Sequence, residues 1–491
     1  MDNKTRQNLY LVCIVLICSL AFLLRIKTYL LARPLWHDEC SLATNILARD
    51  FGGFFQPLDN GQKAPAIFMI LNKIVSLFGG ISELSLKFVP MLSGLFSVIA
   101  FYFLSKEMLK NKFSIIVANF LFAINYQLIY WAQKFKQYSF DVLLFMISIL
   151  FFTKLDLNKI SYKKTFLLSF IGILMVLASF PCAFVLGAYI LFCIIKRINF
   201  KKIILFCFPL ISFCLFYYLI YLQADNKVWM TEYFKYWGSG FLNLGLNNFF
   251  TIVRENFNFF FIPNYYTLIG LLLFVFGLIL YLKERNKTSD IILLSFLGII
   301  VASALQIYPI WQRAALYLLP IVLLFITKPL DLLSKNKKIL NSIIIILFWA
   351  YFSKYNIFYV NNFLNQNAFA FTDAITVFPK LVERYSNNDI LVINSTTKAD
   401  FIYYSKIYKF NPQNIILVPI NTYDKEYYYN FMNTLQKGHT YWFVFGWEYS
   451  HKLDDLENSI SNHLNNYIND HHLKVVEKYE DNNSILIKVK I

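Results

Sequence analysis

The chain has 491 residues, of which 58% are hydrophobic and 19% aromatic, and its mean hydropathy is +0.50. This composition excludes an ordinary soluble globular protein, because apolar runs of roughly 17–25 residues, each long enough to cross a bilayer, recur between residues 9 and 352. The net charge of +17 is uneven: residues 358–491 carry 12 Lys and Arg against 14 Asp and Glu, so the basic excess lies in residues 1–357. Basic charge confined to loops between apolar runs is a topology signal and argues against a nucleic-acid-binding protein.

The first apolar run, residues 9–24, follows a polar N-terminus with Lys4 and Arg6, and no small-residue cleavage pattern comes after it. We therefore expect an uncleaved first span with the N-terminus inside. A polar loop over residues 25–63 follows and contains the adjacent carboxylates Asp38 and Glu39. Residues 64–78 are apolar but short, and they form either a further span or a helix along the membrane surface.

The charge of the later loops decides between these alternatives. With residues 64–78 on the surface, the predicted spans are 9–24, 87–104, 113–129, 138–153, 165–178, 182–195, 203–222, 264–282, 289–306, 314–327 and 339–355. Basic clusters at 106–112, 154–164, 196–202, 283–287 and 328–338 then share the side of the N-terminus, which the positive-inside rule makes cytoplasmic. The sequence thus predicts a polytopic α-helical membrane protein with about eleven transmembrane helices and a surface helix in its first outer loop.

This topology gathers the loops 25–86, 130–137, 223–263 and 307–313 and the polar tail on the outer face. We predict two domains, a transmembrane domain over residues 1–357 and a small extracytoplasmic α/β domain over residues 358–491. Strand-like runs of the tail are 389–394, 414–418, 441–445, 474–479 and 484–490, and helix-like segments are 372–385, 423–435 and 454–468. The tail has no GxGxxG and no P-loop, so it is interpreted as a covering or acceptor-binding module without a nucleotide.

Four outer-face segments carry the candidate chemistry. Asp38 and Glu39 lie in the first loop, and Gln62-Lys63-Ala64-Pro65 opens the surface helix. The second outer loop reads YWAQKFKQY over residues 130–138, and the last reads YPIWQR over residues 308–313. In order, spacing and common side, these segments resemble the motifs of the bacterial GT-C glycosyltransferases, the group that includes protein O-mannosyltransferases and lipid A aminoarabinose transferases. In that group an Asp-Glu pair follows the first span, and a Lys or His beside a proline opens a surface helix.

The resemblance implies a GT-C fold in the bacterial inner membrane and an inverting enzyme. It would move a sugar from a polyprenyl-phosphate carrier to a hydroxyl of a lipid, glycan or protein outside the cytoplasm. Asp38 is the candidate general base, because a carboxylate within hydrogen-bond reach can take the proton of a poorly nucleophilic hydroxyl. The phosphate leaving group needs positive charge rather than a general acid, and the candidates are Lys63, Arg313 and Lys136. Glu39 and His37 are assigned to acceptor binding or loop support.

Other residues are candidates for supporting roles. Asp141 lies one turn inside a span, where an acid is costly, and is predicted to orient Lys136 or Tyr138. Glu83 either pairs with Lys87 across one helical turn or serves the site. Tyr308 opens the last motif.

No cofactor is assigned, and a divalent metal is left as an open alternative. The second acidic motif with which related oligosaccharyltransferases hold a metal is absent, and Gln62 stands where lipid A transferases carry an acid. The seven cysteines include no CxxC pair, so no zinc or disulfide framework is predicted. Two other functions remain: a transporter or flippase of polyprenyl-linked lipids, which would carry ionisable groups at mid-membrane depth, and a non-catalytic membrane scaffold.

Overall fold

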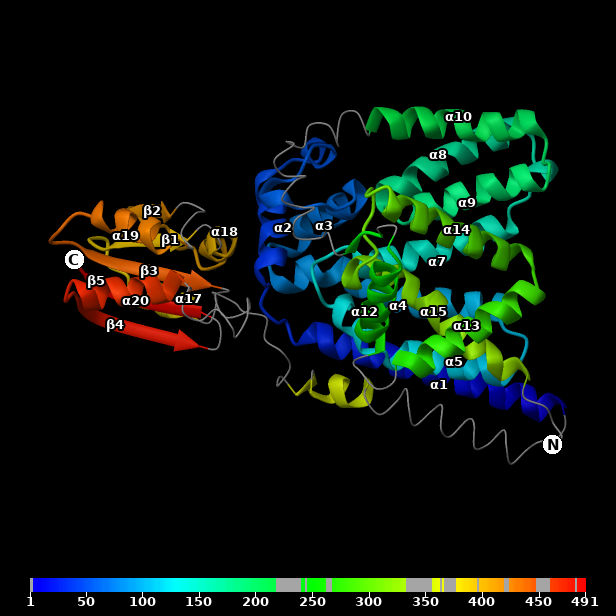
Figure 1. The fold of residues 1–491 in the computed structure, drawn as a ribbon, viewed down its shortest axis with the longest axis horizontal. Helices are drawn as coiled ribbons and strands as arrows, with labels where there is room; N and C mark the ends of the chain where they lie inside the picture. The colour runs from blue at the N-terminus through cyan, green and yellow to red at the C-terminus, as the bar shows by residue number, and fades with distance from the viewer. Residues whose placement is uncertain are drawn as a thin grey trace.

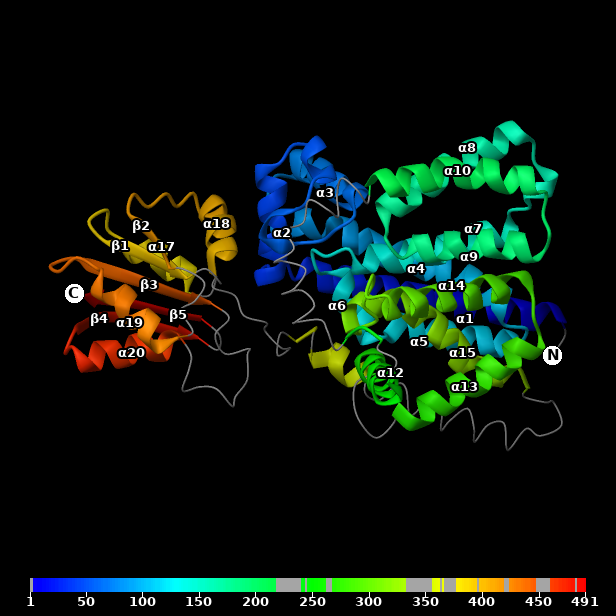
Figure 2. The ribbon, with the colours of Figure 1, turned by 45° about the horizontal axis from the view of Figure 1, so that its top comes forward.

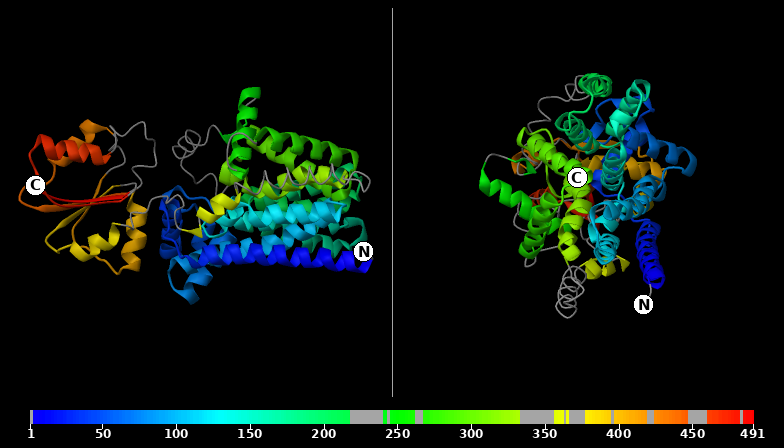
Figure 3. Two further views of the ribbon diagram at one scale, coloured as in Figure 1. Left: turned by 90° about the horizontal axis from the view of Figure 1, so that it is seen from below. Right: turned by 90° about the vertical axis from the view of Figure 1, so that its right-hand side faces the viewer.

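The structure is a computed structural model, and it describes residues 3–217, 240–242, 245–261, 267–332, 356–362, 364–365, 377–394, 397–418, 424–446, 460–481 and 484–491. Most of the described chain forms a bundle of helices that run side by side, and a smaller unit with a β-sheet lies at one end of the bundle (Figure 1). The N-terminus lies at the other end, and the first helix runs the length of the bundle (Figure 3).

The bundle contains α1 (Asn3–Leu30), α2 (His37–Ala48), α3 (Ala66–Gly79), α4 (Glu83–Met108), α5 (Lys112–Ile124), α6 (Tyr126–Ala132), α7 (Tyr138–Lys154), α8 (Tyr162–Ala178), α9 (Cys182–Ile195), α10 (Phe200–Tyr217), α12 (Leu246–Phe261), α13 (Thr267–Lys283), α14 (Lys287–Ala304) and α15 (Leu319–Thr327). Short 3-10 helices are η1 (Gly52–Phe55), η2 (Asp59–Gly61), η3 (Leu157–Lys159), η6 (Gln312–Leu318) and η7 (Lys328–Leu332). Polar side chains fix several helix starts. Ser82, Asn111 and Asn286 each accept a hydrogen bond from a backbone N–H of the first turn, as N-cap residues do.

Four helices of the described part are long and apolar enough to cross a membrane, namely Lys4–Leu30, Glu83–Met108, Lys287–Ala304 and Gln312–Leu332. The pair α5 and α6 makes a fifth candidate, and Ala66–Gly79, Cys182–Ile195 and Leu268–Lys283 are shorter apolar helices. The number of about eleven spans stays a prediction, because the predicted span 339–355 and part of 203–222 lie outside the described residues. Most of the predicted outer loop 223–263 also lies outside them.

The predicted span 113–129 is broken in the structure. Its two halves, α5 and α6, meet at an angle of 49°. At the break the buried Arg25 of α1 donates hydrogen bonds to the carbonyls of Ala123 (3.2 Å) and Phe122 (3.4 Å). Asn125 then caps α6 by accepting a hydrogen bond from the Leu128 N–H at 3.2 Å. The carbonyls of Phe122 and Ala123 and the N–H of Leu128 at the break are therefore hydrogen-bonded inside the protein.

The loops that carry the predicted inner-face charge meet at the end of the bundle that holds the start of α1. Lys112 hydrogen-bonds to Gln7, and Lys287 donates to the carbonyl of Leu155. The ammonium of Lys202 donates to the carbonyls of residues 157, 158 and 160 at 2.6–2.9 Å. Four basic loops thus gather at one end, as the alternation of charge along the sequence predicts, and most of the fifth, 328–338, lies outside the described residues.

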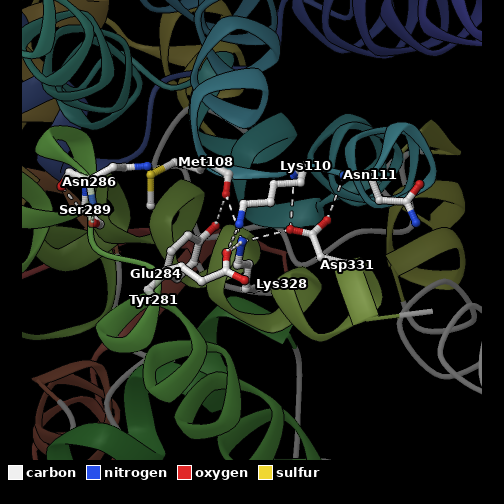
Figure 4. Close-up of polar contacts among 9 residues, drawn as sticks. All are labelled: Met108, Lys110, Asn111, Tyr281, Glu284, Asn286, Ser289, Lys328 and Asp331. Atoms are coloured by element: carbon white, nitrogen blue, oxygen red, sulfur yellow. Dashed lines mark hydrogen bonds and ion pairs between the residues drawn. The ribbon is translucent and has the colours of Figure 1, made fainter. Parts of the chain in front are cut away.

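A buried ion cluster ties this end together (Figure 4). The Lys328 side chain is 2% exposed, and its ammonium lies 3.0 Å from Glu284 Oε2 and 2.9 Å from Asp331 Oδ2. Asp331 also accepts hydrogen bonds from the backbone N–H groups of Lys110 (3.1 Å) and Asn111 (3.0 Å). The cluster therefore links the end of α15 to the start of α5 and to the turn after α13. Helices α13 and α15 also pack backbone against backbone near this cluster. A Cβ added at Gly277 of α13 would lie 1.8 Å from the carbonyl oxygen of Phe325 in α15, so this position requires glycine.

The C-terminal unit contains α17 (Phe378–Arg384), β1 (Ile390–Asn394), α18 (Lys398–Ile407), β2 (Ile415–Val418), α19 (Lys425–Asn433), β3 (Thr440–Gly446), α20 (Ile460–Asp470), β4 (Lys474–Asp481) and β5 (Ser484–Lys490). Its five-stranded sheet has the order β2-β1-β3-β5-β4. β1 is parallel to β2 and β3, whereas β5 is antiparallel to β3 and β4. The strands lie where the sequence predicts them, whereas the predicted helices 372–385, 423–435 and 454–468 begin outside the described residues.

Successive side chains of a strand point to opposite faces of the sheet, so neighbouring residues of one strand pack on different sides. Leu391 and Ile393 pack with Trp442 on the side of α17 and α18, and Val392 and Phe443 pack on the side of α19 and α20. Figure 2 shows the two helix pairs on opposite sides of the sheet. The first of these clusters continues without interruption into α2, α3 and α4 of the bundle. The C-terminal unit therefore shares a hydrophobic core with α2, α3 and α4.

Candidate active site

The predicted outer-face segments meet at the end of the bundle that contacts the C-terminal unit. Asp38 lies in the first turn of α2, where the positive end of the helix dipole favours a carboxylate. Its Oδ2 lies 2.8 Å from Nη1 of Arg313 and 4.0 Å from Nζ of Lys136. The Asp38 side chain keeps 24% of its surface exposed, so a small group can still reach it. Three segments far apart in sequence thus converge on one carboxylate.

The charges around Asp38 decide its protonation. Burial acts to raise the pKa of Asp38, but the positive charges of Lys136, Arg313 and His37 outweigh it and hold this pKa below its usual value. Asp38 is therefore ionised at neutral pH and available to accept a proton. Burial lowers the pKa of Lys136 to about 8, against the opposing attraction of Asp38. Lys136 is thus mostly protonated at neutral pH and loses its charge in mildly alkaline solution.

Arg313 is held by an unusual turn. It follows Gln312, whose φ of +41° is in the left-handed region that non-glycine residues seldom occupy. The preceding Ile310 donates a backbone hydrogen bond to the Gly240 carbonyl at 2.9 Å. The Arg313 guanidinium lies 5.3 Å from the ring centroid of Trp36, a cation–π distance. The turn and the indole therefore aim the guanidinium at Asp38.

Lys136 is joined to the segment ahead of α3. Its ammonium donates a hydrogen bond to Gln62 Oε1 at 2.6 Å, and the neighbouring Gln137 amide donates to the carbonyl of Lys63 at 3.0 Å. Lys63 is half-buried beside this contact. The loop before α7 and the segment ahead of α3 are thus joined by two hydrogen bonds, which bring Lys136 and the backbone of Lys63 to the same region.

Glu39 has a different environment from its neighbour Asp38. Its side chain is fully buried, with Oε2 accepting from the Trp36 N–H at 3.2 Å and lying 3.4 Å from the Lys134 ammonium. Its Oε1 accepts from the backbone N–H of Phe135. Of the two predicted roles, these contacts are those of loop support. Glu39 holds the loop before α7 against the start of α2, which places Lys136 next to Asp38.

His37 lies beside Asp38 and contacts the C-terminal unit. Its Nδ1 lies 3.2 Å from Oδ2 of Asp400 in α18. The Leu35 N–H donates to the Tyr404 hydroxyl at 2.8 Å, two residues before His37 in the chain. His37, predicted to serve acceptor binding or loop support, thus contacts a carboxylate of the C-terminal unit, and its role at the site stays a prediction.

The predicted supporting residues lie around this centre. Asp141 accepts a hydrogen bond from the Ser179 hydroxyl at 2.6 Å, so its partner belongs to the turn before α9. Tyr138 packs edge-on against Trp131, and the Tyr308 hydroxyl donates to the Ala314 carbonyl at 3.4 Å.

Glu83 is half-buried in the first turn of α4, and Lys87 donates to the carbonyl of Arg33 at 2.5 Å. This contact turns the Lys87 ammonium toward the chain that leads into α2.

Sequence reasoning missed three kinds of contributor. Lys134 lies in the second motif but was given no role, and Trp36, interpreted from the sequence as an aromatic of the membrane interface, packs with Lys134 against the centre. Gln62 accepts a hydrogen bond from Lys136, although only its neighbour Lys63 is a site candidate from the sequence. Asp400 lies 363 residues from His37, and no local pattern signals such a contact.

Within the described residues, no three His, Cys, Asp or Glu side chains come together in a way that could hold a metal ion. The side chains nearest Asp38 are Arg313 and Lys136, and their positive charges oppose the binding of a metal cation. The described site therefore fits an anion better than a metal.

Neither a model of a known protein family nor a curated protein matches the sequence. Among solved structures, ArnT from Cupriavidus metallidurans bound to undecaprenyl phosphate is similar over 98% of both chains, with a TM-score of 0.58 and 10% identity. The same protein in the apo state gives a TM-score of 0.55 at 10% identity over 98% of both chains. An oligosaccharyltransferase from Archaeoglobus fulgidus, in complex with Zn and sulfate, covers 88% of this chain and 68% of its own at 12% identity and a TM-score of 0.46.

The likeness to ArnT over nearly the whole chain defines the fold. The protein is a helical membrane protein with the GT-C fold, and the resemblance seen in its motifs is confirmed at this level. ArnT is a lipid A aminoarabinose transferase.

Proposed function

We propose that this protein is an integral-membrane glycosyltransferase that moves a sugar from a polyprenyl-phosphate carrier to an acceptor hydroxyl, with inversion at the anomeric carbon. One observation carries the proposal. An ionised, partly exposed carboxylate lies within 4.0 Å of two cations, Arg313 and Lys136, at one end of a GT-C bundle. A base beside a paired positive charge is what this displacement requires, because a proton leaves the acceptor while negative charge develops on phosphate.

In this mechanism Asp38 takes the proton of the acceptor hydroxyl as its oxygen attacks the anomeric carbon. The bond from that carbon to the phosphate oxygen breaks, and its electron pair stays on the phosphate. The products are the glycosylated acceptor and polyprenyl phosphate, and Asp38 later releases its proton to water. Arg313 and Lys136 stabilise the phosphate, and Lys63, whose carbonyl accepts a hydrogen bond from Gln137 next to Lys136, is a further candidate. Arg presents a planar fork suited to phosphate oxygens, whereas Lys acts as a point charge.

The contact between Asp38 and Arg313 gives the reaction an order. Arg313 Nη1 lies 2.8 Å from Asp38 Oδ2. An arriving phosphate competes for the same guanidinium, which would release the carboxylate and restore part of its basicity. Donor binding thus precedes activation of the acceptor, and the base is occupied until a leaving group is present.

The orientation of the protein belongs to the proposal. The basic loops gather at one end of the bundle and the active site at the other, so we place the site and the C-terminal domain outside the bacterial inner membrane. Single cysteines at Lys201 and Asn411, both exposed, in a cysteine-free background should label from opposite sides of intact cells. Labelling from the same side would contradict this orientation.

The function is tested with Asp38→Asn, which keeps size and hydrogen-bonding reach but cannot accept a proton at neutral pH. Sugar transfer in membranes should fall by ~10²–10⁴-fold. Binding of undecaprenyl phosphate should be retained or strengthened, because Arg313 and Lys136 lose their competing carboxylate. Asp50→Asn, an exposed carboxylate of the same outer loop, is the control and should leave both unchanged.

Near-normal transfer by Asp38→Asn would refute the assignment of the base. Movement of the lipid across the bilayer by the wild type, without sugar transfer, would instead favour the flippase. Mass spectrometry of lipid that co-purifies with the protein would identify the sugar on the carrier.

A further inference from the structure

The contact between the C-terminal domain and the catalytic helix is close and polar. Helix α18 packs against α2, and Figure 2 shows the two helices next to each other. The Tyr404 hydroxyl of α18 accepts from the Leu35 N–H at 2.8 Å and lies 3.3 Å from the Leu35 carbonyl, to which it donates. Tyr403 and Tyr404 are both fully buried. This seam fixes the C-terminal domain to the residues directly ahead of Asp38.

Asp400 places a carboxylate in this seam. Its Oδ2 lies 3.2 Å from Nδ1 of His37, and its side chain is only 6% exposed. The other oxygen, Oδ1, is buried and has no hydrogen-bond partner among the described residues. A buried carboxylate without full hydrogen bonding is costly unless a cation compensates it. The imidazole of His37 is the cation that the geometry offers.

His37 and Asp38 are consecutive in the first turn of α2, and both keep about a quarter or less of the side chain exposed, at 22% and 24%. The charged groups that face His37 are Asp400 from α18, Asp38 on α2 itself and Lys136 from the loop before α7. Burial acts to lower the pKa of His37, but the hydrogen bond and charge of Asp400 outweigh it and raise this pKa above its usual value. The imidazolium is in turn one of the three positive charges that stabilise ionised Asp38.

Resting on the transferase function proposed above, we propose that Asp400 is a positioning residue of the catalytic centre. The C-terminal domain supplies its carboxylate to hold His37 as a cation beside Asp38, so that transfer depends on the docking of α18 on α2. The domain thereby completes the electrostatics of a site whose base and phosphate ligands all belong to the membrane part. Asp400 does not touch the reacting atoms, and its effect passes through His37.

The test compares Asp400→Asn, which keeps the shape but removes the charge, with Tyr404→Phe, which removes a neighbouring contact of the same seam and leaves the charge. Both variants are made in the full-length protein. In Asp400→Asn, the pKa of His37 should fall by about one unit or more, measured by NMR on protein with 13C-labelled histidine. Tyr404→Phe should leave this pKa unchanged, and Asp400→Glu should restore it in part. The His37→Gln variant identifies the resonance.

Transfer rates against pH give the second readout. Because the site needs His37 protonated, the alkaline fall in kcat of Asp400→Asn should move to lower pH by about one unit. This shift would make the variant roughly tenfold slower on the alkaline side, with recovery toward the wild-type rate in mild acid. The double variant His37→Gln/Asp400→Asn should be no slower than His37→Gln alone, because both changes remove the same interaction.

An identical titration of His37 in wild type and Asp400→Asn would overturn the proposal, as would a fall in rate that is uniform across pH. Absence of sugar transfer by the wild type would refute the transferase function instead. In that case the NMR titration still decides whether Asp400 controls His37, so the two failures are distinguishable.

Discussion

The adjacent carboxylates Asp38 and Glu39 should fail in different ways when each is neutralised. In Glu39→Gln the fully buried side chain keeps one oxygen and turns its amide nitrogen toward a backbone N–H, either that of Phe135 or that of Trp36. A lost hydrogen bond to a charged group costs about 1.5–3 kcal/mol and an unsatisfied buried donor about 1–3 kcal/mol. The attraction to the Lys134 ammonium 3.4 Å away is weakened as well. We therefore expect the free energy of unfolding to fall by at least ~3 kcal/mol.

The assay is thermal unfolding in detergent, with sugar transfer measured well below the transition and corrected for the folded fraction. Glu39→Gln should lower the midpoint by several degrees and keep transfer per folded molecule within about tenfold of wild type, whereas Asp38→Asn should lose at least ~10²-fold without a comparable loss of stability. Glu107→Gln, an exposed carboxylate at the opposite end of the bundle, is the control. An unchanged midpoint for Glu39→Gln, or a loss of transfer equal to that of Asp38→Asn, would refute the division of roles.

Three further outcomes are expected. Arg313→Ala should weaken binding of undecaprenyl phosphate by at least ~10-fold, because a phosphate charge is left uncompensated, and Arg313→Lys should weaken it less. If Arg313→Ala and the wild type bound this lipid with equal affinity at equilibrium, Arg313 would not belong to the phosphate site. Binding of this lipid should weaken as pH rises above about 8, because Lys136 is charged below that pKa and neutral above it. Lys136→Arg should abolish the decline, and a decline that persists in this variant would exclude Lys136 as its cause. Lys328→Met should lower stability by about 3–5 kcal/mol, because it leaves the buried carboxylate of Asp331 without its cation, whereas Glu284 keeps Lys110 at 2.8 Å. Lys110→Met, at a residue whose side chain is 72% exposed, should cost less than ~1 kcal/mol, and equal thermal midpoints for the two variants would show that the cluster does not stabilise the bundle.

Elements with a strong hydrophobic period could be predicted from the sequence almost residue by residue. The run 182–195 is α9, and the tail strands coincide with β1 to β5 because alternation and β-branched residues mark them locally. The break between α5 and α6 was not predicted, since apolar residues continue through it. Asn125 within the run is the one local signal, and the compensating Arg25 lies on another helix.

The site was predictable in part because parity of the spans assigns each loop to a side. Asp38, Lys136 and Arg313 come from three loops of the same predicted face, and the structure brings them within 4.0 Å of one oxygen. The sequence does not show that the Asp38 side chain is partly exposed whereas that of Glu39 is fully buried. It depends on the direction each side chain takes from the first turn of α2, one toward the open face and the other into the loop before α7.

The balance of charge at the site explains why a donor phosphate should bind there although the side chains already pair with one another. Cationic and anionic groups of the centre are unequal in number, with the cations Arg313, Lys136, Lys134 and protonated His37 facing the carboxylates Asp38, Glu39 and Asp400. These paired groups leave one positive charge in excess, to which Lys63 adds, and the sugar-linked phosphate of the donor carries one negative charge. When the sugar leaves, the phosphate gains negative charge while Asp38 is neutralised by the acceptor proton, so the sum over the centre is conserved during transfer. A site of this kind avoids building up uncompensated charge at partial burial, where such charge is most costly. Removal of the Asp38 carboxylate should consequently tighten phosphate binding while transfer is lost, whereas Asp400→Asn should not tighten it, because His37 then gives up its own positive charge.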